Sequence, residues 1–80
     1  MPRAASVSAQ VRLQALLREV RSEAGLTQTD LARRLGQPQS FVSKYESGER
    51  RLDILELRQV CQAIGVSLPE FIRRLEEALG

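Results

Sequence analysis

The fold of this chain is decided by residues 27–48, which have the sequence TQTDLARRLGQPQSFVSKYESG. Thr27, followed three residues later by Asp30, resembles a capping box with Asp in place of Glu, and it predicts the start of a helix. Apolar residues at helical spacing follow until Gly36, a residue type that commonly ends helices. A first short helix is therefore expected here.

A second short helix follows almost at once. Only Gly36 and Gln37 separate the first helix from Pro38, which we predict as the first helical residue because its fixed φ suits that position. The second helix is expected over about residues 38–47, before Gly48. Two short helices joined by such a sharp turn are typical of a helix-turn-helix.

The same kinds of signal predict three more helices outside this segment. No segment shows sustained alternation with β-branched enrichment, so no strand is expected. We therefore predict an all-α, compact five-helix domain. The expected limits are Ser8 or Ala9 to Gly25 for the first helix, Asp53 to Gly65 for the fourth, and Ser67 to the chain end for the fifth.

Length and composition limit the classes of protein that remain. With 80 residues, 42% of them apolar and 28% charged, the chain suffices for one small folded domain. We expect this domain over residues 9–80, after a flexible arm formed by residues 1–8. One Cys and no His remove the usual zinc and haem ligand clusters, so we expect no cofactor and no metal. No apolar run approaches the roughly 18 residues of a membrane span, which predicts a cytoplasmic protein.

Charge is distributed unevenly along the chain. Residues 1–51 hold nine Lys or Arg and five Asp or Glu, a balance of +4, whereas residues 52–80 hold three and five, a balance of −2. This asymmetry favours a polyanionic partner on the N-terminal side. The alternative is a surface that mixed charges merely keep soluble.

The second helix of the pair has two different faces. At about 100° per residue, Phe41, Val42 and Tyr45 gather on a packing side, and the opposite side is polar. A Gln amide can donate and accept at the edge of adenine, Lys can donate to guanine, and Ser hydroxyls can take either role. A merely solvated face would more often carry Glu and Lys four residues apart. The polar side consists of Gln39, Ser40, Ser43, Lys44 and Ser47.

Two runs, LTQTDLARRLG at residues 26–36 and QSFVSKYESGERR at residues 39–51, closely resemble the phage-repressor and Cro-like helix-turn-helix family, also called the XRE family. The resemblance extends over about residues 10–75. It implies a lambda-repressor-like fold whose third helix enters the major groove of double-stranded DNA. Pro38 departs from the family, which usually has Ser or Thr there as a cap. The implied base contacts are Gln39, Ser40, Ser43 and Lys44, and the implied phosphate contacts are Gln28, Ser47, Arg50 and Arg51.

Several side chains are expected to have structural roles. The resemblance implies an ion pair between Arg21 and Glu46; the alternative is that both are ordinary exposed charges. We expect Tyr45 to lie in the core with its hydroxyl at the rim, and Cys61 to be a buried, inert thiol. Phe41 either packs inside the domain or reaches thymine methyl groups or the sugar-phosphate edge.

These observations predict a sequence-specific transcriptional regulator, acting as a repressor that occupies a palindromic operator. A single domain that contacts about four to six base pairs discriminates poorly, so a homodimer is expected, with half-sites about 34 Å apart. Its interface is expected within residues 67–80, with Leu55 as a second candidate. With no His, and with Ser43 and Lys44 about 100° apart on a helix, no enzyme is expected. The alternative is a protein-binding module such as an antitoxin or adaptor, whose partner, a toxin or a polymerase, the sequence does not identify.

Overall fold

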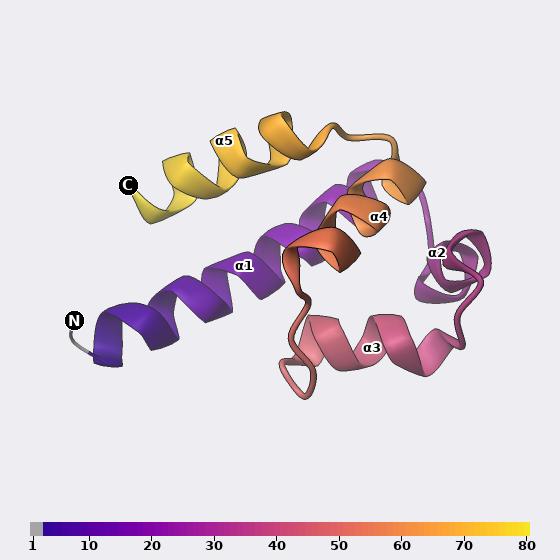
Figure 1. The fold of residues 1–80 in the computed structure, drawn as a ribbon, viewed down its shortest axis with the longest axis horizontal. Helices are drawn as coiled ribbons and strands as arrows, with labels where there is room; N and C mark the ends of the chain where they lie inside the picture. The colour runs from indigo at the N-terminus through magenta and orange to yellow at the C-terminus, as the bar shows by residue number, and fades with distance from the viewer. Residues whose placement is uncertain (1–2) are drawn as a thin grey trace.

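The computed structural model describes residues 3–80, which form five α-helices and no strand (Figure 1). The all-α, five-helix prediction is confirmed. None of the described helices is long and apolar enough to cross a membrane. The helices are α1 (Arg3–Glu23), α2 (Gln28–Leu35), α3 (Gln39–Ser47), α4 (Ile54–Ile64) and α5 (Leu68–Leu79).

The start of α1 differs from the prediction. The helix begins at Arg3 rather than at Ser8 or Ala9, so the backbone of the expected arm is helical from Arg3 onward. Alanine has the highest helix propensity, and no Gly or Pro interrupts the chain between Arg3 and Gly25. The first two residues of the predicted arm lie outside the described residues.

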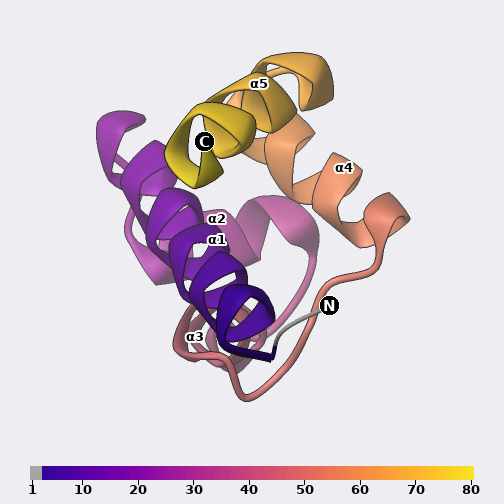
Figure 2. The same ribbon diagram turned by 90° about the vertical axis from the view of Figure 1, so that its left-hand side faces the viewer.

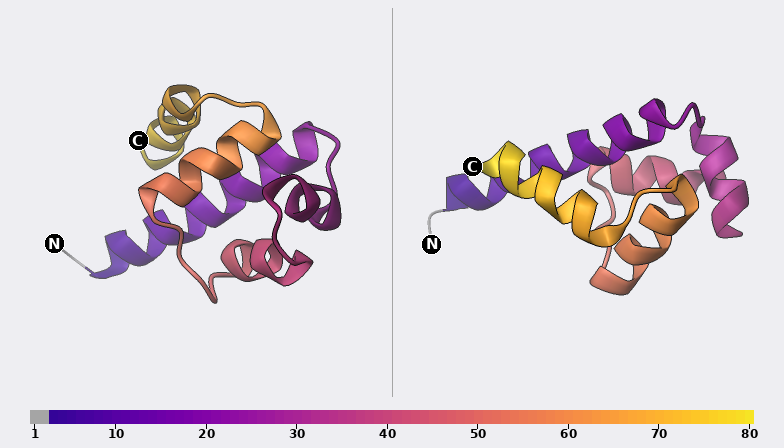
Figure 3. Two further views of the ribbon diagram at one scale, coloured as in Figure 1. Left: turned by 45° about the vertical axis from the view of Figure 1, so that its right-hand side comes forward. Right: turned by 90° about the horizontal axis from the view of Figure 1, so that it is seen from above.

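Helix α1 is the longest element, and the other helices pack around it. It contacts α3 and α5, while α2 packs against α3 and α4, and α4 packs against α5. Figures 1 and 2 show α3 and α5 on opposite sides of the molecule. Figure 3 shows α2 beside the C-terminal end of α1. The helix-turn-helix pair, α2 and α3, is thus held on one side of a scaffold formed by α1, α4 and α5.

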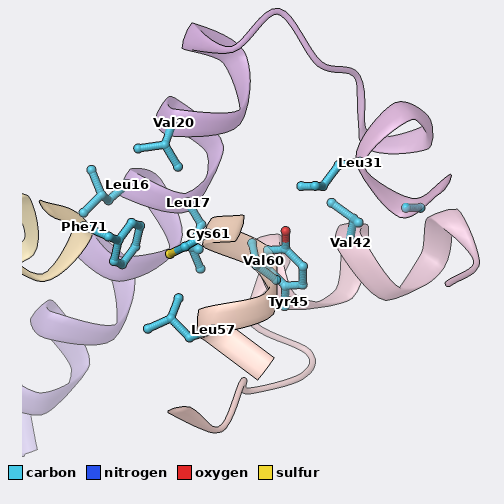
Figure 4. Packing of buried hydrophobic residues seen from close by; sticks show 11 residues of the cluster. Leu16, Leu17, Val20, Leu31, Val42, Tyr45, Leu57, Val60, Cys61 and Phe71 are labelled. Carbon is cyan, nitrogen blue, oxygen red and sulfur yellow. The ribbon is translucent and has the colours of Figure 1, made fainter. Parts of the chain in front are cut away.

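One buried cluster draws side chains from all five helices (Figure 4). Cys61 belongs to it, and burial raises the pKa of its thiol to about 11, so the thiol stays protonated and unreactive at neutral pH. The buried residues of the cluster are Leu16, Leu17, Val20, Leu31, Ala32, Val42, Tyr45, Leu57, Val60, Cys61 and Phe71.

Local capping explains where α2 and α3 begin. Thr27 and Asp30 form the capping box that the sequence predicts, with each side chain accepting from the other residue's backbone N–H at 3.0 Å. Pro38, however, is the N-cap of α3 and not its first helical residue, because its ψ of 155° is extended. It provides no side-chain hydrogen bond to the helix, so α3 starts without the usual polar cap.

The end of α3 is fixed against α1. Gly48 follows α3 with a φ of 90°, a left-handed conformation that glycine adopts without steric cost. A Cβ atom at this position would lie 2.6 Å from Nε2 at the end of the flexible Gln14 side chain of α1, which would have to shift.

The hydroxyl of Tyr45 lies inside the core, not at its rim as predicted. Tyr45 is only 2% exposed, and among the described residues its hydroxyl has no hydrogen-bond partner. An unsatisfied buried hydroxyl is destabilising. Tyr45→Phe is therefore expected to leave the free energy of unfolding unchanged or raise it by up to about 1 kcal/mol, as measured by urea denaturation. A loss of more than about 1 kcal/mol would contradict this expectation, because it would reveal a partner such as a buried water.

Candidate nucleic-acid interface

Helix α3 has one buried face and one polar face, as its sequence predicts. Val42, Tyr45 and Glu46 are buried on the inner side, against α1 and α2. The polar side chains lie on the outer side of the helix-turn-helix, and none of them is fully buried. The outer residues are Gln39, Ser40, Lys44 and Ser47, which are exposed, and Ser43, which is half-buried.

Two serines of this face bond to their own helix. Ser43 Oγ donates to the Ser40 carbonyl oxygen at 3.2 Å, and Ser47 Oγ donates to the Lys44 carbonyl oxygen at 3.1 Å. A hydroxyl has a single proton, so in this arrangement each serine presents lone pairs outward. The two hydroxyls can therefore accept a hydrogen bond from an external donor.

Gln28 and Gln39 contact each other across the turn. Gln39 Nε2 donates to Gln28 Oε1 at 2.6 Å, and Gln28 Nε2 donates to Glu46 Oε1 at 3.0 Å. The oxygen and one N–H of the Gln28 amide, which the resemblance implies contacts phosphate, are thus bonded within the protein. As the first residue of α2, Gln28 still has a backbone N–H without an intrahelical acceptor, and such groups bind phosphates well.

The structure places Arg21 and Glu46 in an ion pair. Arg21 Nε and Nη2 donate to the Glu46 carboxylate at 2.7 and 3.0 Å, and Nη1 donates to the carbonyl of Leu26 at 2.8 Å. Glu46 is 2% exposed and the Arg21 side chain 15%. The hydrogen bond to Glu46 raises the pKa of Arg21, which therefore remains charged. Sequence reasoning missed Arg18, which donates to the Glu46 carbonyl oxygen at 2.8 Å.

Arg50 is held by protein groups rather than left free for phosphate. Its guanidinium donates to both carboxylate oxygens of Glu56, at 2.6 and 3.1 Å, and this hydrogen bonding lowers the pKa of Glu56. The guanidinium also lies 4.8 Å from the centroid of the Phe41 ring. Phe41 in turn packs edge-to-face against Tyr45, with ring centroids 5.6 Å apart. Phe41 is thus half-buried inside the domain, and Arg50 fastens the loop after α3 to α4.

Two cations beside the polar face remain uncommitted. Lys44 and Arg51 are exposed, and neither side chain takes part in a hydrogen bond or ion pair within the described part of the chain. Ser47, a predicted phosphate contact, lies 3.5 Å from the carboxylate of Glu49. Because an adjacent carboxylate repels phosphate, Lys44 and Arg51 are the better placed of these side chains to meet a polyanion.

Fold and site together define a helix-turn-helix domain whose third helix presents an uncapped start, a polar outer face and adjacent free cations. The family model for helix-turn-helix, HTH_3, matches residues 17–71. The chain belongs to this XRE-type family of DNA-binding transcriptional regulators.

Known relatives agree with this assignment. An uncharacterized HTH-type transcriptional regulator of Sinorhizobium fredii, y4dJ, is 36% identical over 58 residues, 72% of this chain and 75% of that protein. A solved XRE-family like protein from Pseudomonas syringae is 47% identical, with a TM-score of 0.79 over 95% of this chain and 96% of that one. The restriction-modification controller protein C.Esp1396I, solved as a tetramer with its natural 35-base-pair operator, is 25% identical, with a TM-score of 0.81 over 89% and 93% of the two chains.

Proposed function

We propose that this protein is a sequence-specific regulator that inserts α3 into the major groove of double-stranded DNA and represses by occupying a palindromic operator. The observation that carries this proposal is the outer face of α3, where short polar side chains stand on a helix fixed by the core. Gln39, Ser40, Ser43 and Lys44 then contact base edges. Such contacts specify sequence, while phosphate contacts position the helix.

Phosphate binding, in this proposal, falls mainly to two places. The N-terminus of α2 offers backbone N–H groups and the positive end of the helix dipole. Arg51 and Lys44 add free positive charge beside α3. Ser47 and Arg50 were predicted to share this role, but the neighbouring carboxylates of Glu49 and Glu56 favour a supporting role for both.

We also infer that the protein acts as a homodimer, since two-fold symmetry matches a palindromic operator. In the predicted segment 67–80, Leu79 is 41% exposed, and α5 lies on the side of the molecule away from α3 (Figure 1). At the start of α4, directly after the loop that follows α3, two neighbouring residues are more exposed than Leu79: Ile54 is 60% exposed and Leu55 70%. These exposures favour an interface that includes Ile54 and Leu55.

Light scattering tests this interface at tens of micromolar protein. We expect a dimer for the wild-type protein and a monomer for Leu55→Glu, because a buried unpaired charge opposes association. Leu79→Glu, a matched change at the end of α5, is expected to leave the dimer intact. A monomeric Leu79→Glu and a dimeric Leu55→Glu would place the interface on α5 instead.

Selection from random duplexes, followed by fluorescence anisotropy at about 50 and 200 mM salt, tests the proposed function. We expect the wild-type protein to prefer its selected duplex over a scrambled one by about 10³ or more, with affinity falling as salt rises. Failure to select any sequence would overturn the proposal and favour a protein-binding module, such as an antitoxin or adaptor, built on the same fold.

The two neighbouring arginines are expected to contribute differently to binding. Arg51→Ala removes a free cation, so the salt dependence of the affinity, the slope of log K against log[salt], is expected to fall in magnitude by about 1. Arg50→Ala removes a cation already paired with Glu56, so this slope is expected to stay near the wild-type value. A slope reduced by about 1 in both variants would show that Arg50 exchanges Glu56 for phosphate on binding.

A further inference from the structure

A continuous chain of hydrogen bonds links the interior of the domain to the outer face of α3. Arg21 donates to both carboxylate oxygens of Glu46, which also accepts from Gln28 Nε2 at 3.0 Å. Gln28 Oε1 accepts from Gln39 Nε2 at 2.6 Å. Exposure to solvent increases along this series of hydrogen bonds: Glu46 is buried, Gln28 is half-buried and Gln39 is exposed. A buried charge is therefore connected to a surface amide.

The chemistry of Glu46 fixes the direction of these bonds. A carboxylate only accepts, so Gln28 must turn its NH₂ group toward Glu46. The amide oxygen of Gln28 then points the other way, and Gln39 must turn its own NH₂ group toward it. Rotating either amide by 180° would bring two acceptor oxygens together. The orientation of the exposed Gln39 amide thus follows from a buried group on the opposite side of α3.

This orientation determines what Gln39 can offer to a base. Its Oε1 stays free as an acceptor and its second N–H as a donor, in a fixed spatial order. In the major groove adenine presents one donor and one acceptor, whereas guanine presents two acceptors. An amide held in one orientation matches the adenine pattern in one direction only. An amide free to rotate accepts several bases through single hydrogen bonds.

We propose that Glu46, acting through Gln28, is a positioning residue for specificity: it sets the amide orientation of Gln39 and so the base preferred at the one base pair that Gln39 contacts. This inference rests on the proposed function, since it requires Gln39 to contact a base. It assigns a role in discrimination to two side chains that need not touch the DNA.

Two variants interrupt the hydrogen bonds from Glu46 through Gln28 to Gln39 at different residues. The operator used in both tests is the one obtained by selection. The base pair contacted by Gln39 is the one at which Gln39→Ala loses its preference. Gln28→Leu breaks the chain but leaves the ion pair of Glu46 intact. We expect preference at that base pair to fall from roughly tenfold to hundredfold to below about threefold, with the other base pairs unaffected.

Glu46→Gln is expected to weaken the preference at that base pair. Oε1 of Glu46 accepts from both Arg21 Nη2 and Gln28 Nε2, whereas Oε2 accepts from Arg21 Nε. A Gln side chain satisfies either Nε alone or Nη2 together with Gln28, so either its NH₂ group or its oxygen can face Gln28. The amide orientations of Gln28 and Gln39 are then no longer fixed, and the preference is expected to fall as in Gln28→Leu, with the other base pairs unaffected.

Val60→Ala serves as the matched control, because it destabilises the core from α4 and leaves the hydrogen-bonded side chains of Glu46, Gln28 and Gln39 unchanged. All variants are compared at a temperature at which circular dichroism shows them folded, and Val60→Ala is expected to keep the wild-type preference at every pair. If Glu46→Gln does not fold, Gln28→Leu decides the question alone. Retention of the wild-type preference in Gln28→Leu or in a folded Glu46→Gln, or an equal loss at all base pairs, would overturn the inference. If the wild-type protein selects no sequence, that result would instead refute the proposed function on which this inference rests.

Discussion

Arg21→Ala is expected to lower the free energy of unfolding by about 3 to 4 kcal/mol, because it leaves the carboxylate of Glu46 buried without its counter-ion. Glu46 would keep its bond from Gln28, but one neutral donor does not replace a bidentate guanidinium. Loss of the bond from Arg21 to the carbonyl of Leu26 adds to the effect. For a domain of this size, the midpoint of thermal unfolding should fall by roughly 15 °C or more.

A matched control is available on the surface. Arg74 pairs with Glu23 and Glu19, whose side chains are about half exposed, so Arg74→Ala is expected to cost no more than about 1 kcal/mol. The double variant Arg21→Met, Glu46→Met replaces the buried pair by apolar groups and is expected to recover much of the stability lost in Arg21→Ala. Thermal and urea unfolding followed by circular dichroism measure all three. Equal losses for Arg21→Ala and Arg74→Ala would show that the buried pair has no special weight.

Most of the fold follows from local signals in the sequence. Thr27 and Asp30 form the complete capping box that the sequence predicts, and a second capping box, of Asp53 and Glu56, stands at the predicted start of the fourth helix. Such boxes are local signals because the interacting groups are three residues apart. The start of α1 differs because no single residue there forces a boundary, and helix ends without a cap are set by weak propensities.

The site was less predictable, because its contacts depend on how separate elements meet. The phosphate contact that the resemblance implies for Gln28 stays a prediction, but the position of its amide between Glu46 and Gln39 depends on the packing of α2 on α3. Arg50 was likewise implied by the resemblance as a phosphate contact. Its pairing with Glu56 depends on how the loop after α3 returns to α4, although an acidic capping residue six positions away was a usable signal.

The hydroxyl of Tyr45 shows the same limit within the core. Helical periodicity places the ring on the packing side, and this is correct. Periodicity does not give the depth of the pocket that receives the ring, so the rim position expected for the hydroxyl was wrong. The side of a helix on which a residue lies can be inferred from the sequence of that helix alone. How deeply its side chain is buried depends on the neighbouring helices.

Replacing both Gln39 and Ser43 by Ala is expected to abolish sequence preference while leaving general DNA affinity in place. Each good base contact contributes about 1 to 3 kcal/mol of discrimination, so losing two should reduce the preference for the selected duplex by roughly 10²- to 10⁴-fold. Both side chains are neutral, so the salt dependence of binding should not change. Fluorescence anisotropy with the selected and scrambled duplexes, at two salt concentrations, measures both quantities.

This double variant should fold normally, which makes its binding result interpretable. Ala is the best helix former, and neither Gln39 nor Ser43 is fully buried. Its natural comparison is Arg51→Ala, which should weaken binding to both duplexes alike and reduce the salt dependence. If the Gln39→Ala, Ser43→Ala protein kept its preference and Arg51→Ala lost it, the base contacts would have to lie in the loop after α3. The opposite pair of results separates the two tasks of the site: the outer face of α3 selects the sequence, and the flanking charge supplies affinity that is independent of sequence.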